Sequence, residues 1–166
     1  MSYTPTILIV DDDPFVRDIL ETLLRQHGLE TRTASSGKKA IECLDKDEFD
    51  LVLLDIVMPD IDGFQVMDHI FRQSEDTVVI IITGHTSTES AIEALRRGAY
   101  YYLSKPIEHE ELVKMVKNGL DQKRLKTERK RAEEALKKAY DELERQVKER
   151  TEELLKANEK LTHEVE

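Results

Sequence analysis

The sequence predicts an α/β fold, a (βα)5 doubly wound parallel sheet, followed by a long C-terminal α-helix that forms a coiled coil. Through the first 122 residues, short apolar runs alternate with segments of helical period, as in folds built from βα units. Most of these runs are apolar at every position, which is typical of strands covered on both faces of a sheet. Beyond residue 119 the chain contains no glycine or proline, so its composition permits one uninterrupted helix.

Five apolar segments are the expected strands. Most of them are four or five residues long and consist of Ile, Val, Leu or Tyr, residue types that are favoured in strands. The second segment is the weakest, because polar residues interrupt it. The expected strands lie at residues 7–10, 29–34, 51–54, 78–82 and 100–103.

Apolar residues spaced three and four apart predict a helix after each strand. The first helix is the clearest: we expect Asp13 to cap its N-terminus and Gly28 to follow its last turn. Five such units in about 120 residues are long enough to bury a hydrophobic core. The apolar residues of the expected helices lie within 15–24, 40–44, 64–71, 91–95 and 112–120.

The chain is expected to divide into a domain at residues 1–122 and a helix at 123–166 that continues the domain's fifth helix. The first part has a net charge of −11, whereas the second has 13 basic and 12 acidic residues. The second part carries an apolar stripe with a mean spacing of about 3.6 residues, too narrow to be covered by a globular core. We predict that the stripe pairs two copies as a coiled-coil homodimer, the alternative being a single solvated helix braced by ion pairs. The stripe comprises Leu136, Tyr140, Leu143, Val147, Thr151, Leu154, Asn158, Leu161 and Val165.

Composition excludes several classes of protein. Cys43 is the only cysteine, which rules out a disulfide framework and fits a reducing compartment. The N-terminus lacks the basic region of a signal peptide, and no stretch approaches the ~20 apolar residues of a membrane span. The acidic first part would repel nucleic acid. We therefore expect a cytoplasmic protein that neither inserts into membranes nor binds nucleic acid.

Polar residues follow four of the predicted strands at the point where each strand ends. Asp11 and Asp12 follow the first strand, Asp55 the third, Thr83 the fourth and Lys105 the fifth. Because ligands of open α/β sheets bind at the carboxyl ends of the strands, we expect these side chains to converge. Clustered carboxylates suit Mg2+, and a lysine and a hydroxyl suit phosphoryl oxygens. Each residue alone has a structural explanation, but together they predict phosphoryl transfer to Asp55.

Four motifs occur in a distinctive order and spacing: Asp11-Asp12, Asp55 within DIVMPDIDG, Thr83-Gly84 and Lys105-Pro106. This arrangement resembles the receiver domain of two-component response regulators, and the resemblance covers about residues 5–122. It implies a flavodoxin-like fold with the strand order 2-1-3-4-5. It also implies that a sensor histidine kinase or a phosphotransfer protein donates the phosphoryl group.

The resemblance implies that Asp55 is the phosphoacceptor. Mg2+ would be held by Asp11, Asp12, Asp55 and the main-chain carbonyl of Val57. The domain would assist its own phosphorylation and its later dephosphorylation, with no separate enzymatic activity in this chain.

The resemblance also assigns roles to residues near the phosphoacceptor. Lys105 would contact the phosphoryl group, Thr83 would be the switch hydroxyl and Tyr102 the switch aromatic. Val57 and His85 stand two residues beyond Asp55 and Thr83, at positions that influence the lifetime of the phosphate in this family. His85 is equally compatible with a solvated loop residue.

The tail has a resemblance of its own. Residues 143–165, which contain the motif ERTEEL, resemble the signalling-helix linkers of sensor histidine kinases. The tail would then relay the phosphorylation state of the receiver.

Three other interpretations remain open at this stage. The chain could be a coiled-coil scaffold whose receiver takes no phosphate. It could be an Mg2+-dependent phosphohydrolase with an aspartyl nucleophile, although such enzymes need an acid where Val57 stands. The basic run at residues 123–131 could mark a DNA-binding helix, but such runs are usually solvated.

Overall fold

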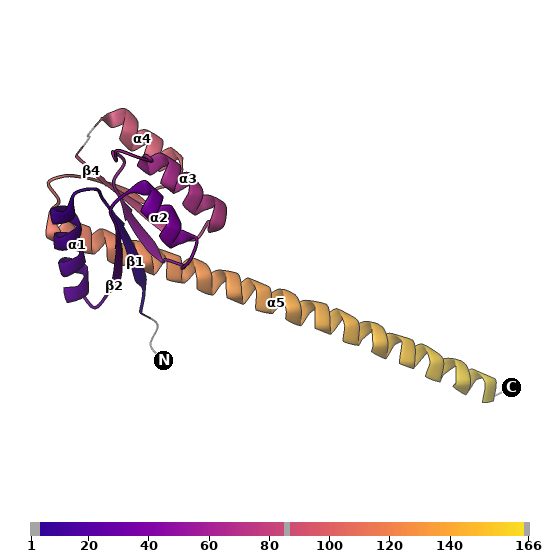
Figure 1. The fold of residues 1–166 in the computed structure, drawn as a ribbon. Helices are drawn as coiled ribbons and strands as arrows, with labels where there is room; N and C mark the ends of the chain where they lie inside the picture. Colours follow the sequence, from indigo (N-terminus) through magenta and orange to yellow (C-terminus); the bar gives the residue numbers. More distant parts are fainter. Residues whose placement is uncertain (1–3, 85–86, 165–166) are drawn as a thin grey trace. The chain divides into compact units, whose positions relative to one another are not determined.

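The computed structural model describes residues 4–84 and 87–164, and the strands and helices within these ranges alternate (Figure 1). This confirms the predicted (βα)5 arrangement followed by a long helix. Most expected boundaries agree with the observed ones to within a few residues. The elements are β1 Thr6–Val10, α1 Pro14–Gln26, β2 Glu30–Ala34, α2 Gly37–Leu44, β3 Leu51–Leu54, α3 Gly63–Gln73, β4 Val78–Thr83, α4 Thr88–Arg96, β5 Tyr101–Ser104 and α5 His109–Glu164.

The strands form one parallel sheet in the order β2-β1-β3-β4-β5, as predicted. Val10, the last residue of β1, lies opposite Ala34 of β2 and Leu54 of β3. The residues that follow β1 and β3 therefore leave the sheet at the same level. Those residues are Asp11 and Asp55, whose amides are fixed by bonds to the Ala34 and Val10 carbonyls at 3.2 and 2.9 Å.

Side chains of the sheet fill two separate hydrophobic clusters, one on each face. One cluster joins alternate strand residues such as Val52 and Leu54 to α2, α3 and α4. The other joins Leu51 and Leu53 to α1 and to the first turns of α5. Because all four residues of β3 are buried, both faces of this central strand are covered. The polar residues thus emerge from a sheet that is packed on both faces.

The ends of α1 are set by the two residues that the sequence singles out. The Asp13 carboxylate accepts a hydrogen bond from the Phe15 amide at 2.9 Å, which confirms Asp13 as the N-cap. At the other end Gly28 has a φ of 77°, a conformation that glycine adopts more readily than other residues.

The N-terminus of α2 is held by a carboxylate from a distant loop. Asp60 accepts hydrogen bonds from the amides of Gly37 at 3.1 Å and Lys38 at 2.9 Å. The bond from the Lys38 amide, then one from the Ile61 amide, and to a smaller extent the bond from Gly37 lower the pKa of Asp60 from 3.8 to about 2. The loop after β3 is thus tied to α2 by an ionised side chain.

We expect Asp60→Asn to destabilise the protein at neutral pH but not in strong acid. Asp60 is ionised in the folded protein down to about pH 2, while its ordinary pKa is 3.8. Its contribution is therefore complete well above pH 3.8 and is lost as the pH falls through about 2. Urea unfolding of both proteins at several pH values measures this, and an NMR titration that puts the pKa of Asp60 near 3.8 would contradict it.

The chain forms two compact units, Met1–Leu125 and Lys126–Glu166, and α5 contributes to both. In the first unit, α5 packs closely on the sheet at Gly119, where an added Cβ would lie 2.9 Å from Val78 Cγ1. Gly119 therefore serves close packing, although by helix propensity alone it would be a weak point.

A buried carboxylate holds the end of the first unit. Asp50 lies just before β3 and is 7% exposed. One of its oxygens accepts a hydrogen bond from the Thr6 amide at 2.9 Å, and the other pairs with Lys123 Nζ of α5 at 2.8 Å. This contact fixes α5 two residues before the first unit ends.

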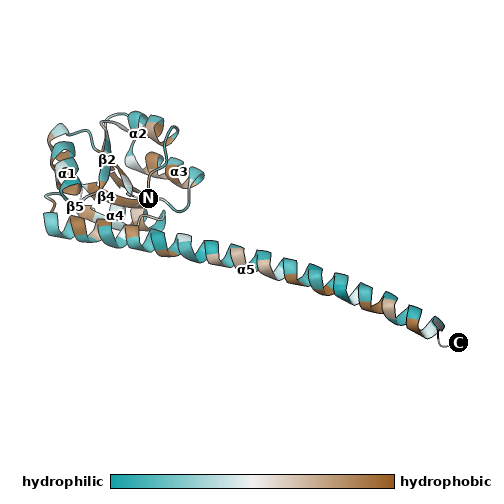
Figure 2. Ribbon diagram, turned by 90° about the horizontal axis from the view of Figure 1, so that it is seen from below, coloured by the Kyte–Doolittle hydropathy of each residue, from teal (hydrophilic) through white to brown (hydrophobic). Residues whose placement is uncertain are grey.

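In the second unit, the side chains of residues 128–163 are exposed. Apolar residues recur among hydrophilic ones along this part of α5 (Figure 2). Six members of the apolar stripe are between 56% and 70% exposed, so nothing in this unit covers them. Over the described parts of the chain, no helix combines the length and the apolar character that a membrane crossing requires.

Candidate functional site

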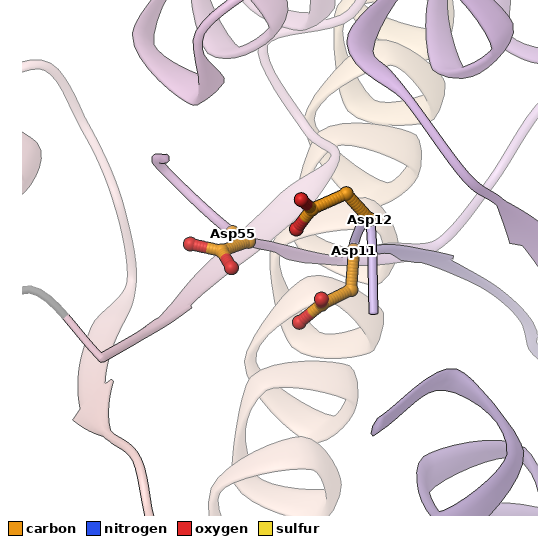
Figure 3. Close-up of side chains that lie close together, drawn as sticks. All are labelled: Asp11, Asp12 and Asp55. Atoms are coloured by element: carbon orange, nitrogen blue, oxygen red, sulfur yellow. The ribbon is translucent and has the colours of Figure 1, made fainter. Parts of the chain in front are cut away.

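Three carboxylates meet at the carboxyl end of the sheet. The side chains of Asp11 and Asp12, after β1, and of Asp55, after β3, lie close together (Figure 3). One oxygen from each lies within 4.8 Å of the other two. Asp11 and Asp55 are 2% and 4% exposed, whereas Asp12 is exposed. The structure therefore brings together the three acids that the strand-end argument selected.

Lys105 lies between the two buried acids. Its ammonium Nζ is 2.6 Å from Asp11 Oδ2 and 2.8 Å from Asp55 Oδ2. Burial lowers the pKa of Lys105, but its bonds and charge interactions with Asp11 and Asp55 outweigh that effect, so the pKa is raised. Lys105 is thus a fixed positive charge beside the Asp55 carboxylate.

The environment of Asp11 disfavours the ionised form of its carboxyl group, although Lys105 pairs with it. Burial raises the pKa of Asp11, and bonds from Lys105 and from the Asp13 amide only partly oppose this. The nearby Asp55 carboxylate raises it further. The site therefore carries more negative charge than one ammonium group neutralises, and a bound cation would relieve this.

The residues present fit a small divalent cation. All three side chains offer carboxylate oxygens, the ligands that Mg2+ prefers. At the usual Mg–O distance of about 2.1 Å, two ligands of one ion stand at most about 4.2 Å apart, so oxygens that lie within 4.8 Å of one another would have to draw together slightly around the ion. The exposure of Asp12 leaves one side of the cluster accessible to solvent, as a cation that retains waters requires.

The loop after β3 holds the Asp55 carboxylate in a defined position. Asp55 Oδ1 accepts a hydrogen bond from the Val57 amide at 3.0 Å. Gly63, at the start of α3, lies so close that an added Cβ would be 2.4 Å from the Asp55 carbonyl oxygen. Gly63 N also donates to Ile56 O at 2.8 Å. The tight loop therefore depends on a glycine within the DIVMPDIDG motif.

Thr83, the expected switch hydroxyl, and Tyr102, the expected switch aromatic, lie on the neighbouring strands β4 and β5. Thr83, the last residue of β4, is fully buried, and its carbonyl accepts a bond from the Lys105 amide at 2.9 Å. Tyr102 of β5 is partly buried against the cluster that includes α4. Burial, and then the negative charge of Asp55, raise the pKa of Tyr102. His85 lies outside the residues that the structure describes.

Sequence reasoning missed Arg17. Its guanidinium Nη1 donates to the Asp11 main-chain oxygen at 2.6 Å. Side chains of a helix tilt toward its N-terminus, so an arginine in the first turns of the predicted helix could have been expected to reach the acidic loop before it.

The chemistry that this arrangement supports is the acceptance of a transferred group by a carboxylate. Asp55 is held on one oxygen by an amide and on the other by an ammonium. A phosphoryl group placed there would meet Lys105, and a cation on the acids would oppose the charge of its oxygens.

Comparison with known proteins agrees with this chemistry. The model of the response regulator receiver domain family matches residues 7–117. The chain is 39% identical over 113 residues to the response regulator protein PilR of Pseudomonas aeruginosa, and 37% identical over 130 residues to the regulatory protein AtoC of Escherichia coli. These matches cover 68% and 78% of this chain, but 25% and 28% of the relatives. The chain therefore spans about a quarter of the length of these two relatives.

Solved structures show the same fold. A CheY-like receiver domain protein from Methanospirillum hungatei matches with a TM-score of 0.72 and 28% identity, over 75% of this chain and 99% of that one. NtrX from Brucella abortus matches with a TM-score of 0.72 and 34% identity, over 76% of this chain and 29% of that one.

Proposed function

Because this chain belongs to the response regulator receiver domain family, we propose that Asp55 accepts a phosphoryl group from a histidine kinase or phosphotransfer protein, in a reaction that depends on Mg2+. The observation that carries the proposal is the placement of the Asp55 carboxylate 2.8 Å from Lys105 and next to Asp11 and Asp12. We assign these residues the roles that the motifs imply: Asp55 as acceptor and the three acids as metal ligands. The Val57 carbonyl is the proposed fourth ligand.

In the proposed reaction, a carboxylate oxygen of Asp55 forms a bond to phosphorus as the bond from phosphorus to the donor's histidine nitrogen breaks. The electron pair of the broken bond stays on the imidazole, which takes a proton from solvent. Lys105 and the Thr83 hydroxyl donate to the transferred phosphoryl oxygens. Bound Mg2+ would neutralise part of the charge on these oxygens. The chain thereby assists its own modification and does not turn over a separate substrate.

We propose that the switch consists of Thr83 and Tyr102. Phosphorylation adds close to two negative charges and three acceptor oxygens beside Asp55. Thr83 would turn toward them, and Tyr102 would move into the space that Thr83 leaves. The surface of α4, β5 and the first turns of α5 would change as a result.

We propose that the phosphorylation state of the receiver is relayed through α5 to a homodimeric coiled coil. The support is the exposed apolar stripe of the second unit, together with the Asp50–Lys123 contact that holds α5 near the end of the first. A second copy of the chain would cover the stripe. The expected cytoplasmic location, and the expectation that the chain binds no nucleic acid, stay predictions.

Incubation with a small phosphodonor such as phosphoramidate, with and without Mg2+, tests the function. We expect the protein to gain one phosphoryl group only with Mg2+, and peptide mapping to place it on Asp55. Absence of any labelling would favour the scaffold interpretation. Continuous turnover of p-nitrophenyl phosphate would favour the phosphohydrolase.

We expect Val57→Asn to shorten the lifetime of the aspartyl phosphate. The Val57 side chain is 54% exposed and apolar, so it cannot orient a water molecule for attack. An asparagine amide at this position could, and one added hydrogen bond in the transition state corresponds to roughly a tenfold faster hydrolysis. Loss of label after removal of the phosphodonor measures this, with Val57→Thr as a smaller polar comparison. An unchanged or slower rate in Val57→Asn would refute the prediction.

A further inference from the structure

We propose that Arg17 is a positioning residue for the metal-binding loop: its guanidinium fixes the peptide group between Asp11 and Asp12 so that both carboxylates face Asp55. The inference rests on the metal site of the proposed function and extends it to a residue outside the acid cluster. Among the described residues, the Arg17 side chain bonds to the main chain of the loop and not to the carboxylates of the acid cluster or to Lys105.

The contact that carries the proposal is short and directed at the main chain. Arg17 Nη1 lies 2.6 Å from the Asp11 carbonyl oxygen, and a bond from a charged donor is stronger than one between neutral groups. The Arg17 amide also donates to Asp13 O at 3.2 Å, which starts the first turn of α1. The side chain of Arg17 therefore runs from the first turns of α1 back toward the acidic loop that precedes the helix.

With this contact, every polar group of the buried Asp11 has a partner. Its amide donates to Ala34 O at 3.2 Å, its Oδ1 accepts from the Asp13 amide at 2.9 Å, and its Oδ2 meets Lys105 at 2.6 Å. The carbonyl is the remaining group, and Arg17 satisfies it. Loss of Arg17 would remove this partner from a residue that is only 2% exposed.

The consequence reaches Asp12 through the covalent chain. The Asp11 carbonyl belongs to the peptide group that joins Asp11 to Asp12, and peptide groups are planar. If this peptide group rotated so that its carbonyl met another donor, the direction of the N–Cα bond of Asp12 would change. The Asp12 carboxylate would then move away from the carboxylates of Asp11 and Asp55. Arg17 therefore acts on the cation site through backbone geometry.

If Arg17 acted only through its charge, replacing it would change the affinity for a divalent cation in the opposite direction. The sign of the change in affinity therefore tests the proposal. Arg17 is a positive charge near three carboxylates, so its removal would strengthen the attraction for a divalent cation. Positioning predicts weaker binding, because the ligand set is no longer held together. The two roles therefore cannot be mistaken for each other.

The experiment measures Mn2+ binding to the full chain by water-proton relaxation, without any phosphodonor. We expect Arg17→Met to raise the Kd for Mn2+ about tenfold and Arg17→Lys, which keeps a charged donor, to restore most of the affinity. Arg25→Met is the matched control, because Arg25 is on the same helix and has the same charge but pairs with Glu21 and Thr31. Circular dichroism of each variant without metal checks that it is folded, and Arg17→Gln replaces Arg17→Met if the latter is not.

Each outcome decides between the roles. Weaker binding in Arg17→Met, with rescue by lysine and no loss in Arg25→Met, supports positioning. Equal or tighter binding in Arg17→Met overturns the role of Arg17 while leaving the metal site intact. No Mn2+ binding by the unmodified protein overturns the metal site itself, and the inference with it.

Discussion

Asp55→Asn is expected to reduce phosphoryl incorporation to background while the protein stays folded. The amide is not a nucleophile toward phosphorus, and we expect neither Asp11 nor Asp12 to take its place, because both are proposed to hold the cation. The asparagine oxygen can still accept the bond from the Val57 amide, and the substitution removes one of the mutually repelling charges. The loss should therefore be chemical and not structural.

The measurement is the mass of the intact protein after incubation with phosphoramidate and Mg2+. Asp62→Asn is the matched control: Asp62 lies in the same loop, but its carboxylate caps α3 by accepting from the Gln65 amide at 2.9 Å. Asparagine is an equally good capping residue, so this variant should be labelled like the unmodified protein. Phosphate that persists on Asp55→Asn would refute the assignment of the acceptor.

The sequence predicts the convergence of Asp55 and Lys105, although they are 50 residues apart, because both follow strands of a parallel sheet. The same rule brings Asp11, Asp12 and Thr83 to that edge. It requires only the strand pattern, which is pronounced where each strand is continuously apolar. The fold class and the long helix are therefore accessible from the sequence pattern, and the strand order from the resemblance to receiver domains.

Contacts between side chains of one element and the main chain of another are not accessible in this way. The bonds that the Asp60 carboxylate accepts from the amides of α2 depend on backbone direction and rotamers, and so does the pairing of the Asp50 and Lys123 side chains. No residue pattern encodes these features. Gly119 is instructive, because its helix propensity suggests a weakness where the structure has a close contact with β4.

Leu154→Lys is expected to abolish dimerisation at concentrations where the unmodified protein is dimeric. Leu154 belongs to the apolar stripe and is 69% exposed in the single chain. A coiled coil would bury it from both copies, so its loss costs about 3 kcal/mol or more, roughly a 100-fold rise in Kd. Lysine is as good a helix former as leucine, so the helix itself should persist.

Leu155→Lys separates dimerisation from a general effect of charge. Leu155 is 59% exposed and lies next to Leu154, but about 100° around the helix and off the stripe. If two helices pair through the stripe, light scattering should show Leu154→Lys as a monomer and Leu155→Lys still largely dimeric. A solvated single helix, braced by pairs such as Arg145 with Glu142 at 2.7 Å, would make both variants and the unmodified protein monomeric. Such exposed pairs contribute little, roughly 0–1 kcal/mol each, and they leave the stripe uncovered, which is why we expect the paired helix.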